Sequence, residues 1–135
     1  MSNQDPNLQT IQSIYAAFGK GDVPAILSML SPDAEFAFAG GSAEVPWHGP
    51  WRGPAGITRF FSAIGESVEF KTFEPLGFAA GADTVAVRLH LVYKVRGSSR
   101  VVDEHQVHWW TFRDGKVTTL THFEDTAQVI AAMRR

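Results

Sequence analysis

The stretch that most constrains the fold of this chain is residues 101–133, VVDEHQVHWWTFRDGKVTTLTHFEDTAQVIAAM, which predicts two strands joined by a turn and followed by a helix. Successive side chains of a strand point to opposite faces, so alternate residues share a face. One such face carries Glu104, Gln106, His108 and Trp110 on the first strand, and Leu120, His122 and Glu124 on the second. Polar and titratable groups in that arrangement either meet water or line a cavity, and the function depends on which is the case.

The size and composition of the chain limit the classes of protein to consider. With 135 residues, 44% of them hydrophobic, the chain can bury one core, so we expect a single domain over residues 1–135. A net charge of −2 and a pI near 6.2 argue against a nucleic-acid partner. The absence of cysteine excludes disulfides and thiol chemistry. No apolar run approaches the length of a membrane span and the N-terminus has no secretory signal, so we expect no membrane contact and a cytoplasmic protein.

The first half of the chain carries the signals of three helices and one strand. Asp5-Pro6 predicts a helix start, with Asp as the N-cap and Pro in the first turn. Asp22 predicts the cap of a second, short helix, whose apolar face reaches Leu30 and which Ser31-Pro32 stops. The expected helices cover residues 6–19, 23–30 and 54–65, and the expected strand covers 34–39. Between them, the Gly/Pro/Trp-rich loop 40–53 exceeds the usual connection length, which makes it a candidate lid or rim.

The second half of the chain is mostly strand. Apolar residues alternate with polar ones from Val85 to Tyr93, a strong signal of an amphipathic strand. Shorter strands are expected at 68–73 and 76–79, and Gly97-Ser98 and Asp114-Gly115 predict hairpin turns. Asp125, with Gln128 three residues later, predicts the cap of a final helix. Helices followed by an antiparallel sheet indicate the α+β class.

Three segments of the chain resemble a known superfamily. IYAAFGKGDVPAILSMLSPDAEF, WRGPAGITRFF and HWWTFRDGKVTTLTHFED occur in the order typical of the ketosteroid-isomerase-like and SnoaL-like polyketide cyclases, whose fold is shared with nuclear transport factor 2. The resemblance covers nearly the whole chain. It implies a cone-shaped curved antiparallel sheet, three N-terminal helices that enclose a cavity, and a short C-terminal helix. It does not fix the chemistry, because this fold hosts isomerases, cyclases, dehydratases and plain binding domains.

The resemblance also implies which sheet face lines the cavity. Matching FRDGKV to the family's last hairpin places His108 on the cavity side together with Leu120, His122 and Glu124. In an antiparallel hairpin, the numbers of two residues that lie opposite each other always add up to the same value. This match requires that value to be even, which a bulged Asp-Gly turn provides and a simple two-residue loop does not. The isomerase apparatus itself mostly fails to carry over. Its general-base Asp falls at Phe38, its oxyanion-binding Tyr falls next to Tyr15, and its second oxyanion donor falls at His108.

The catalytic candidates are therefore His108, His122 and Glu124. An imidazole titrates near neutrality, and a neighbouring carboxylate such as Glu124 or Glu104 would orient it and raise its pKa. Such a pair could move a proton next to a carbonyl or assist the loss of water. Two alternatives stay open. The histidines could lie on a polar face whose groups only hydrogen-bond one another or solvent, or the two histidines and a Glu could bind a metal ion. We expect no metal and no cofactor.

The substrate-binding candidates share an aromatic or apolar character or a position on the cavity face. They are Tyr15, Phe38, Trp51, Phe61, Glu104, Trp110 and Leu120. Packing in an ordinary core explains the aromatic residues equally well, and for Tyr15 it is the stronger interpretation because the residue recurs at helical spacing with Leu8 and Ile11. In the long loop, His48 and Arg52 are weaker candidates for ligand contact.

The opposite face of the last two strands is too apolar for solvent. It is expected to hold Val107, Trp109, Val117, Thr119, Thr121 and Phe123, and His90 is also expected away from the cavity. With the resemblance, this face predicts a homodimer interface; without it, the same face could be the core. The sequence thus predicts a cofactor-independent isomerase, cyclase or dehydratase (lyase) acting on a small apolar carbonyl or polyketide-like compound. The alternative is a non-catalytic small-molecule-binding or dimerisation module.

Overall fold

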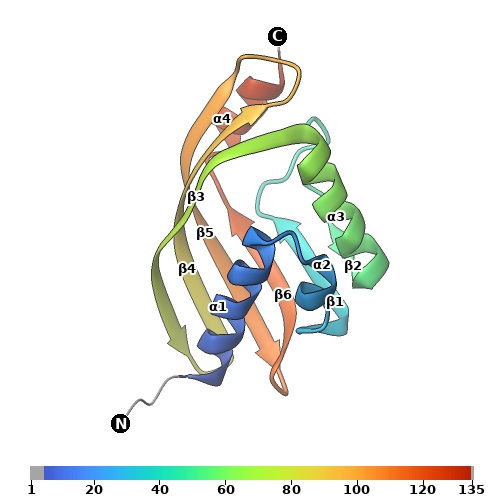
Figure 1. Cartoon of the computed structure of the whole chain (residues 1–135), viewed down its shortest axis with the longest axis vertical. Coiled ribbons are helices and arrows are strands. Elements are labelled where there is room, and N and C mark those ends of the chain that lie inside the picture. Colours follow the sequence, from blue (N-terminus) through green and yellow to red (C-terminus); the bar gives the residue numbers. More distant parts are fainter. Residues whose placement is uncertain (1–4, 135) are drawn as a thin grey trace.

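A curved six-stranded sheet wraps around three helices in the computed structural model, which describes residues 5–134 (Figure 1). The helices are α1 Pro6–Gly19, α2 Val23–Leu27, α3 Gly53–Ser67 and α4 Thr126–Met133, and the strands are β1 Leu30–Phe38, β2 Trp51–Arg52, β3 Val68–Gly81, β4 Thr84–Val95, β5 Val101–Arg113 and β6 Lys116–Phe123. The strand order is β2-β1-β6-β5-β4-β3, antiparallel except for the parallel pair of β1 and β6. Helices α1–α3 lie on the concave side and α4 lies at one end (Figure 1). The predicted α+β class is confirmed.

The predicted starts of α1, α2 and α4 are confirmed by their caps. The Asp5 carboxylate accepts a hydrogen bond from the backbone N–H of Asn7 at 2.8 Å, and Asp22 accepts one from Ala25 at 3.2 Å. The side chain of Asp125 caps α4 in the same way. Each cap satisfies a backbone donor that the first helical turn leaves unpaired. Among the described residues, no helix is long and apolar enough to cross a bilayer.

Three predicted boundaries are wrong. Leu30 is the first residue of β1 and not part of a helix, since α2 ends at Leu27. The two short strands expected at 68–73 and 76–79 are one strand, β3, whose pairing with β4 shifts twice along its length. β3 is an edge strand, where such irregularities and a proline are tolerated. Helix α3 also continues past Gly65 to Ser67.

The hairpin of β5 and β6 places the residues of interest in the expected register by an unexpected route. Arg113 pairs with Lys116, so the turn has two residues, and Asp114 and Gly115 both have positive φ, 53° and 80°, as primed hairpin turns require. A bulge further along the hairpin then shifts the register so that His108 lies opposite His122. The expected even register is confirmed, but the bulge that supplies it lies in the strands and not in the turn.

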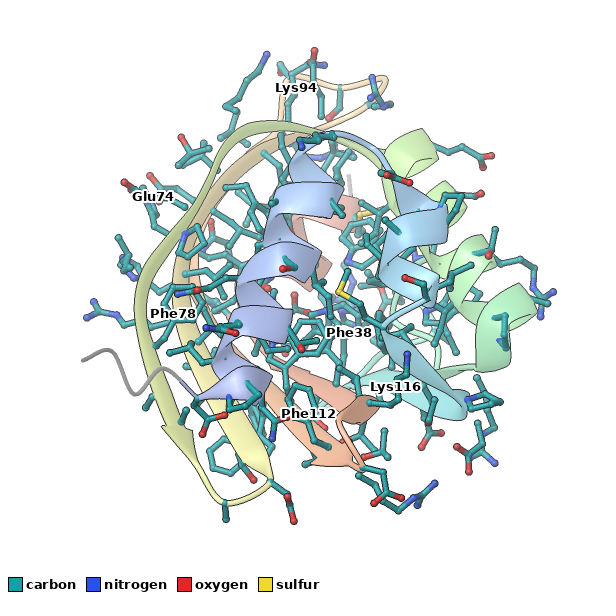
Figure 2. All side chains as sticks on the ribbon, turned by 60° about the horizontal axis from the view of Figure 1, so that its bottom comes forward. Phe38, Glu74, Phe78, Lys94, Phe112 and Lys116 are labelled. Carbon is teal, nitrogen blue, oxygen red and sulfur yellow. The ribbon has the colours of Figure 1, made fainter. Side chains whose placement is uncertain are left out.

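The bulge also changes the side of the sheet to which one side chain of β6 points. Val117 was expected on the outer face, but it is fully buried because its position between the turn and the bulge points it to the interior, opposite Phe112. Other members of the outer face are exposed as expected, including Val107 at 37%, Trp109 at 45% and Phe123 at 47%. Figure 2 shows the contrast between the two sides of the sheet, with Phe38 pointing into the interior and Glu74 pointing away.

Candidate functional site

A cavity with a free volume of about 70 Å³ lies between the helices and the concave face of the sheet. This volume is several times what one buried water needs. Its wall is mainly aromatic and aliphatic, with Gln106, His108 and His122 among the polar groups. The predicted site residues that line it are Tyr15, Phe38, Phe61, His108, Trp110, Leu120 and His122. The cavity interpretation of this sheet face therefore agrees with the structure.

Three predicted site residues do not line the cavity, namely Trp51, Glu104 and Glu124. The Trp51 indole N–H donates to the backbone carbonyl of Trp47 at 2.9 Å, and it is Trp47 that lies in the cavity wall. Trp51 thus holds the long loop in place, and its expected role in substrate binding stays a prediction that the lining of this cavity does not support. The other two residues lie behind the wall, in the polar network described below.

His108 is held in one protonation state by its neighbours. The side-chain NH₂ of Gln106 faces the Glu104 carboxylate at 3.0 Å, so its oxygen must accept from Nε2–H of His108, at 2.9 Å. Nδ1 of His108 is then an acceptor, and the Tyr15 hydroxyl donates to it at 2.7 Å while accepting from the Trp110 indole N–H at 3.1 Å. Burial lowers the pKa of His108 well below its usual value, which agrees with a neutral ring.

His122 presents a free nitrogen to the cavity. Its Nδ1–H donates to the carbonyl of Ala37 at 3.0 Å, so Nε2 carries the lone pair. Nε2 makes no hydrogen bond to any residue between 5 and 134, and it is not sealed from the cavity that His122 lines. Burial lowers the pKa of His122 to about 4. The ring stacks on Phe38 with centroids 3.9 Å apart, and the His108 ring centroid is 4.7 Å away.

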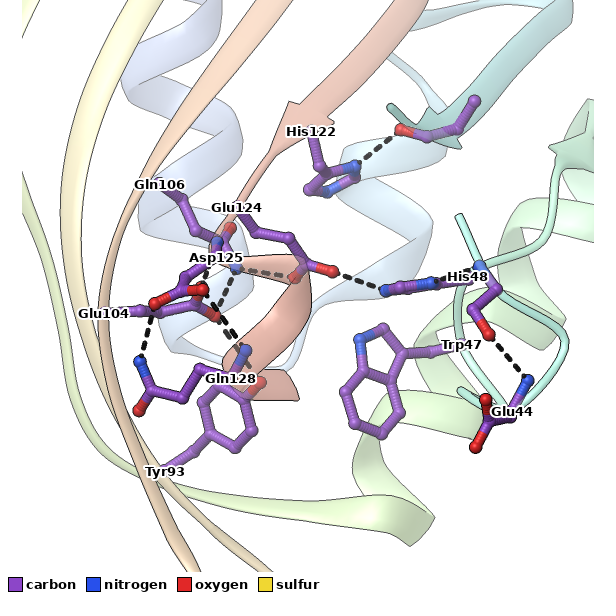
Figure 3. Close-up of polar contacts among 12 residues, drawn as sticks. Glu44, Trp47, His48, Tyr93, Glu104, Gln106, His122, Glu124, Asp125 and Gln128 are labelled. Carbon is purple, nitrogen blue, oxygen red and sulfur yellow. Dashed lines mark hydrogen bonds and ion pairs between the residues drawn. The ribbon is translucent and has the colours of Figure 1, made fainter. Parts of the chain in front are cut away.

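Glu124 pairs with a loop residue and not with His122, which corrects its expected role. Its carboxylate lies 2.5 Å from Nε2 of His48, and both side chains are almost completely buried (Figure 3). The backbone N–H of Ser42 donates to Nδ1 of His48 at 2.9 Å, so Nε2 carries the proton and donates to Glu124. His48 also stacks on Phe38, with centroids 4.6 Å apart. The 40–53 loop is therefore anchored to the end of β6.

Glu104 reaches the histidines only through Gln106. One carboxylate oxygen accepts from the backbone N–H of Asp125 at 2.9 Å, and the other accepts from Gln106 and, at 3.4 Å, from the Tyr93 hydroxyl. Burial is the main cause that raises the pKa of Glu104 to about 7. The prediction that a carboxylate raises the pKa of His108 or His122 is wrong, because neither histidine touches a carboxylate of residues 5–134 and burial lowers both pKa values.

Two residues of the network were undervalued by the sequence reasoning. Gln106 fixes the tautomer of His108, and its position between Glu104 and His108 on the same strand face was a usable signal. His48 is 2% exposed, and nothing local in the loop sequence predicts that it meets Glu124, 76 positions away.

The HxxH spacing of His105 and His108 does not form a metal site. His105 lies on the outer face, where it stacks on His90 with centroids 5.1 Å apart. His90 in turn contacts Asp103 at 2.8 Å. Within residues 5–134, no group of three or more His, Asp or Glu side chains is placed to hold a metal ion.

With this geometry established, the family of the chain can be stated. Residues 11–120 match the SnoaL-like domain family, and the chain belongs to it. No curated protein matches the chain in sequence. Other solved structures with this fold carry the names polyketide cyclase and isomerase.

Several solved structures share the fold over almost the entire chain. An NTF2-like protein of unknown function from Burkholderia pseudomallei is 23% identical with a TM-score of 0.88, covering 98% of this chain and 100% of that one. An NTF2-like protein from Burkholderia xenovorans is 27% identical with a TM-score of 0.86, covering 96% of each chain. TerC, co-crystallised with polyporic acid, is 28% identical with a TM-score of 0.84, covering 96% of this chain and 98% of that one.

Proposed function

We propose that the protein is an acid/base enzyme that isomerises, cyclises or dehydrates a small, flat carbonyl compound without a cofactor. The observation that carries the proposal is the pairing of two complementary groups on one apolar cavity. His122 presents a proton-free Nε2, and the Tyr15 hydroxyl, on a residue that lines the same cavity, forms a hydrogen bond with His108. A base and a neutral donor near one open space are what proton transfer next to a carbonyl requires.

His122 acts as the base in this proposal. Nε2 takes a proton from the carbon next to the substrate carbonyl and leaves an enolate. The Nε2–H then returns the proton to another atom, which completes an isomerisation, or protonates a departing hydroxyl, which completes a dehydration. A conjugate-acid pKa of about 4 suits this role, since ketosteroid isomerase uses a base with a pKa of about 4.6.

Tyr15 stabilises the enolate oxygen in the same step. Burial raises the pKa of Tyr15, so the hydroxyl keeps its proton at neutral pH and acts as a neutral hydrogen-bond donor. The substrate oxygen replaces Nδ1 of His108 as the acceptor of that hydrogen bond. The Trp110 indole N–H, which donates to the same hydroxyl oxygen, increases its donor strength. Glu124 and Glu104 position the surrounding loop and Gln106 and do not touch the substrate.

The cavity favours a ring compound as substrate. Phe38, Phe61 and Trp110 contribute aromatic surfaces to its wall, against which a planar molecule can stack. TerC, a relative at 28% identity, was crystallised with polyporic acid. The aromatic wall supports a flat, largely apolar compound, and the TerC complex supports a small molecule as the ligand. The alternative function is a non-catalytic module that binds such a compound, in which the polar groups only satisfy one another.

Hydrogen exchange on an enolisable ketone separates the two functions. In D₂O, 2-tetralone provides a flat apolar carbonyl compound whose α-hydrogens can be followed by NMR. The wild-type protein is expected to exchange them faster than buffer, and His122→Gln is expected to lower the protein-catalysed rate by about 100-fold. Gln keeps an N–H for the carbonyl of Ala37 but offers no basic nitrogen. Binding of 2-tetralone with exchange no faster than in buffer would instead favour the binding module.

We also propose that the outer sheet face forms a homodimer interface. Trp109, Phe123 and Val107 are between 37% and 47% exposed and lie on neighbouring strands. Apolar residues gathered in this way on one face of a sheet are typical of a buried interface. A two-fold axis through this face would bury the exposed rings of both copies against each other.

A further inference from the structure

A second hollow, here named the vestibule, lies next to the cavity and shares part of its lining. It has a volume of about 260 Å³ and lies where the ends of α1 and α3, together with α2, meet the start of β3. Six of its lining residues also line the inner cavity: Phe18, Ile26, Phe61, Ile64, Val68 and Phe70. The two spaces are therefore neighbours. A ligand with its ring in the inner cavity and another group in the vestibule would have to pass between these shared side chains.

The inner cavity has no formal charge to offer a ligand. Its polar lining groups are two tyrosines, Gln106 and the two histidines, which are neutral in the hydrogen-bond pattern described above. An anionic group moved into such a wall would lose its hydration without gaining an ion pair. An acidic substituent of a substrate is therefore disfavoured inside this cavity.

Arg96 is the cationic residue of the vestibule wall, and it is held there by the end of α3. Its backbone N–H donates to the carbonyl of Ser67 at 2.9 Å, and its Nε donates to the carbonyl of Gly65 at 2.8 Å. Its two terminal nitrogens make no hydrogen bond or ion pair with any residue from 5 to 134. Glu69, the carboxylate on the same wall, is engaged by Lys71 at 3.3 Å. Arg96 is exposed, its Nε is tethered to the carbonyl of Gly65, and its terminal N–H groups are available.

We propose that Arg96 is a specificity residue that binds an acidic substituent of the substrate. The substrate class is then an aromatic or alicyclic carbonyl compound bearing a carboxylate or similar anion, with its ring in the inner cavity and its anion in the vestibule. This inference rests on the proposed function, because it assumes that the cavity holds the ring. The planar guanidinium pairs with a carboxylate or sulfonate through two parallel hydrogen bonds.

Two fluorescent probes that differ in charge test the proposal. One is 1-anilinonaphthalene-8-sulfonate, and the other is its uncharged relative N-phenyl-1-naphthylamine. Arg96→Gln is expected to raise the dissociation constant of the sulfonate about tenfold and to change that of the uncharged probe less than about twofold. Arg100→Gln is the matched control, since it also removes a positive charge and an Nε hydrogen bond to a backbone carbonyl, that of Ala132. It is expected to leave both constants unchanged.

Other outcomes would overturn the inference in distinguishable ways. Equal weakening of both probes in Arg96→Gln would mean that Arg96 only holds α3 in place, and an unchanged affinity for the sulfonate would mean that no anion site exists. Displacement of both probes by 2-tetralone is expected, and probes that stay bound would lie elsewhere on the protein. If neither probe binds the wild-type protein, this inference fails, and hydrogen exchange on 2-tetralone decides separately whether the proposed function stands.

Discussion

Lowering the pH from 6 to 5 is expected to destabilise the protein, because two buried histidines remain neutral in the folded state. His108 and His122 are each 5% exposed, and burial lowers the pKa of both, that of His122 to about 4. In the unfolded chain both bind protons near pH 6.5. Their stabilising effect is therefore fully present above pH 6.5 and is lost as the pH falls toward the folded-state pKa.

The titration of Glu104 changes the free energy of unfolding in the opposite direction over the same pH range. Its pKa is raised from 4.5 to about 7, so the folded protein holds a proton on Glu104 that the unfolded chain releases. Its effect on stability therefore grows as the pH falls from 7 to 4.5. On unfolding, the two histidines take up about two protons and Glu104 releases about one. The unfolded chain therefore binds about one proton more than the folded protein. The free energy of unfolding should then fall by about 1 kcal/mol per pH unit of acidification.

Replacing Glu104 by Gln removes the opposing titration and keeps a neutral side chain of the same shape. The free energy of unfolding is then expected to fall by about 2.5 kcal/mol per pH unit of acidification, which is the slope that two histidines produce on their own. Urea unfolding, followed by tryptophan fluorescence at pH 5.0, 5.5 and 6.0, measures both slopes. Val117→Ala is the control, since it removes part of a fully buried side chain, costs about 2 kcal/mol and should leave the wild-type slope unchanged. A wild-type slope of zero or of opposite sign would refute the reasoning, because the histidines would then take up protons inside the folded protein.

Two further substitutions test the site and the proposed interface. Tyr15→Phe removes the hydroxyl that joins His108 to Trp110 and leaves two buried polar atoms unpaired, so we expect a loss of about 2 kcal/mol and a melting temperature about 7 °C lower by calorimetry. A melting temperature of Tyr15→Phe within about 1 °C of the wild type would contradict the stabilising role of these hydrogen bonds. Trp109→Glu places a charge on the outer face and is expected to sediment as a monomer where the wild type sediments as a dimer; a monomeric wild type, or an unaffected dimer, would rule out this interface.

Part of the site could be predicted because strand periodicity is a local property. The alternation of side chains along each strand showed which residues share a face with His108 and with His122, and the resemblance indicated that this face is the buried one. The resemblance of the last hairpin then indicated an even register with both residues on the cavity side. The period of a strand is set by neighbouring residues, but the bulge that supplies this register lies in the strands and not in the turn.

The remaining errors concern contacts between distant segments or local irregularities. Whether Val117 points in or out depends on a bulge that no turn residue announces. The partner of Glu124 depends on the path of the 40–53 loop, which contacts such as that between Trp51 and the Trp47 carbonyl hold in place. The pKa of His108 depends on how much water reaches the ring, and this is decided by the packing of helices against the sheet.

The stacking of Phe38 gives the cavity a built-in limit on ligand size. The Phe38 ring is stacked with His122 and with His48, and two stacked rings must occupy its opposite faces. A ligand large enough to push Phe38 aside would disturb His122 and also release His48 from its aromatic neighbour. Oversized ligands should therefore loosen the 40–53 loop, and faster amide hydrogen exchange in that loop would report them even where the cavity itself gives no signal.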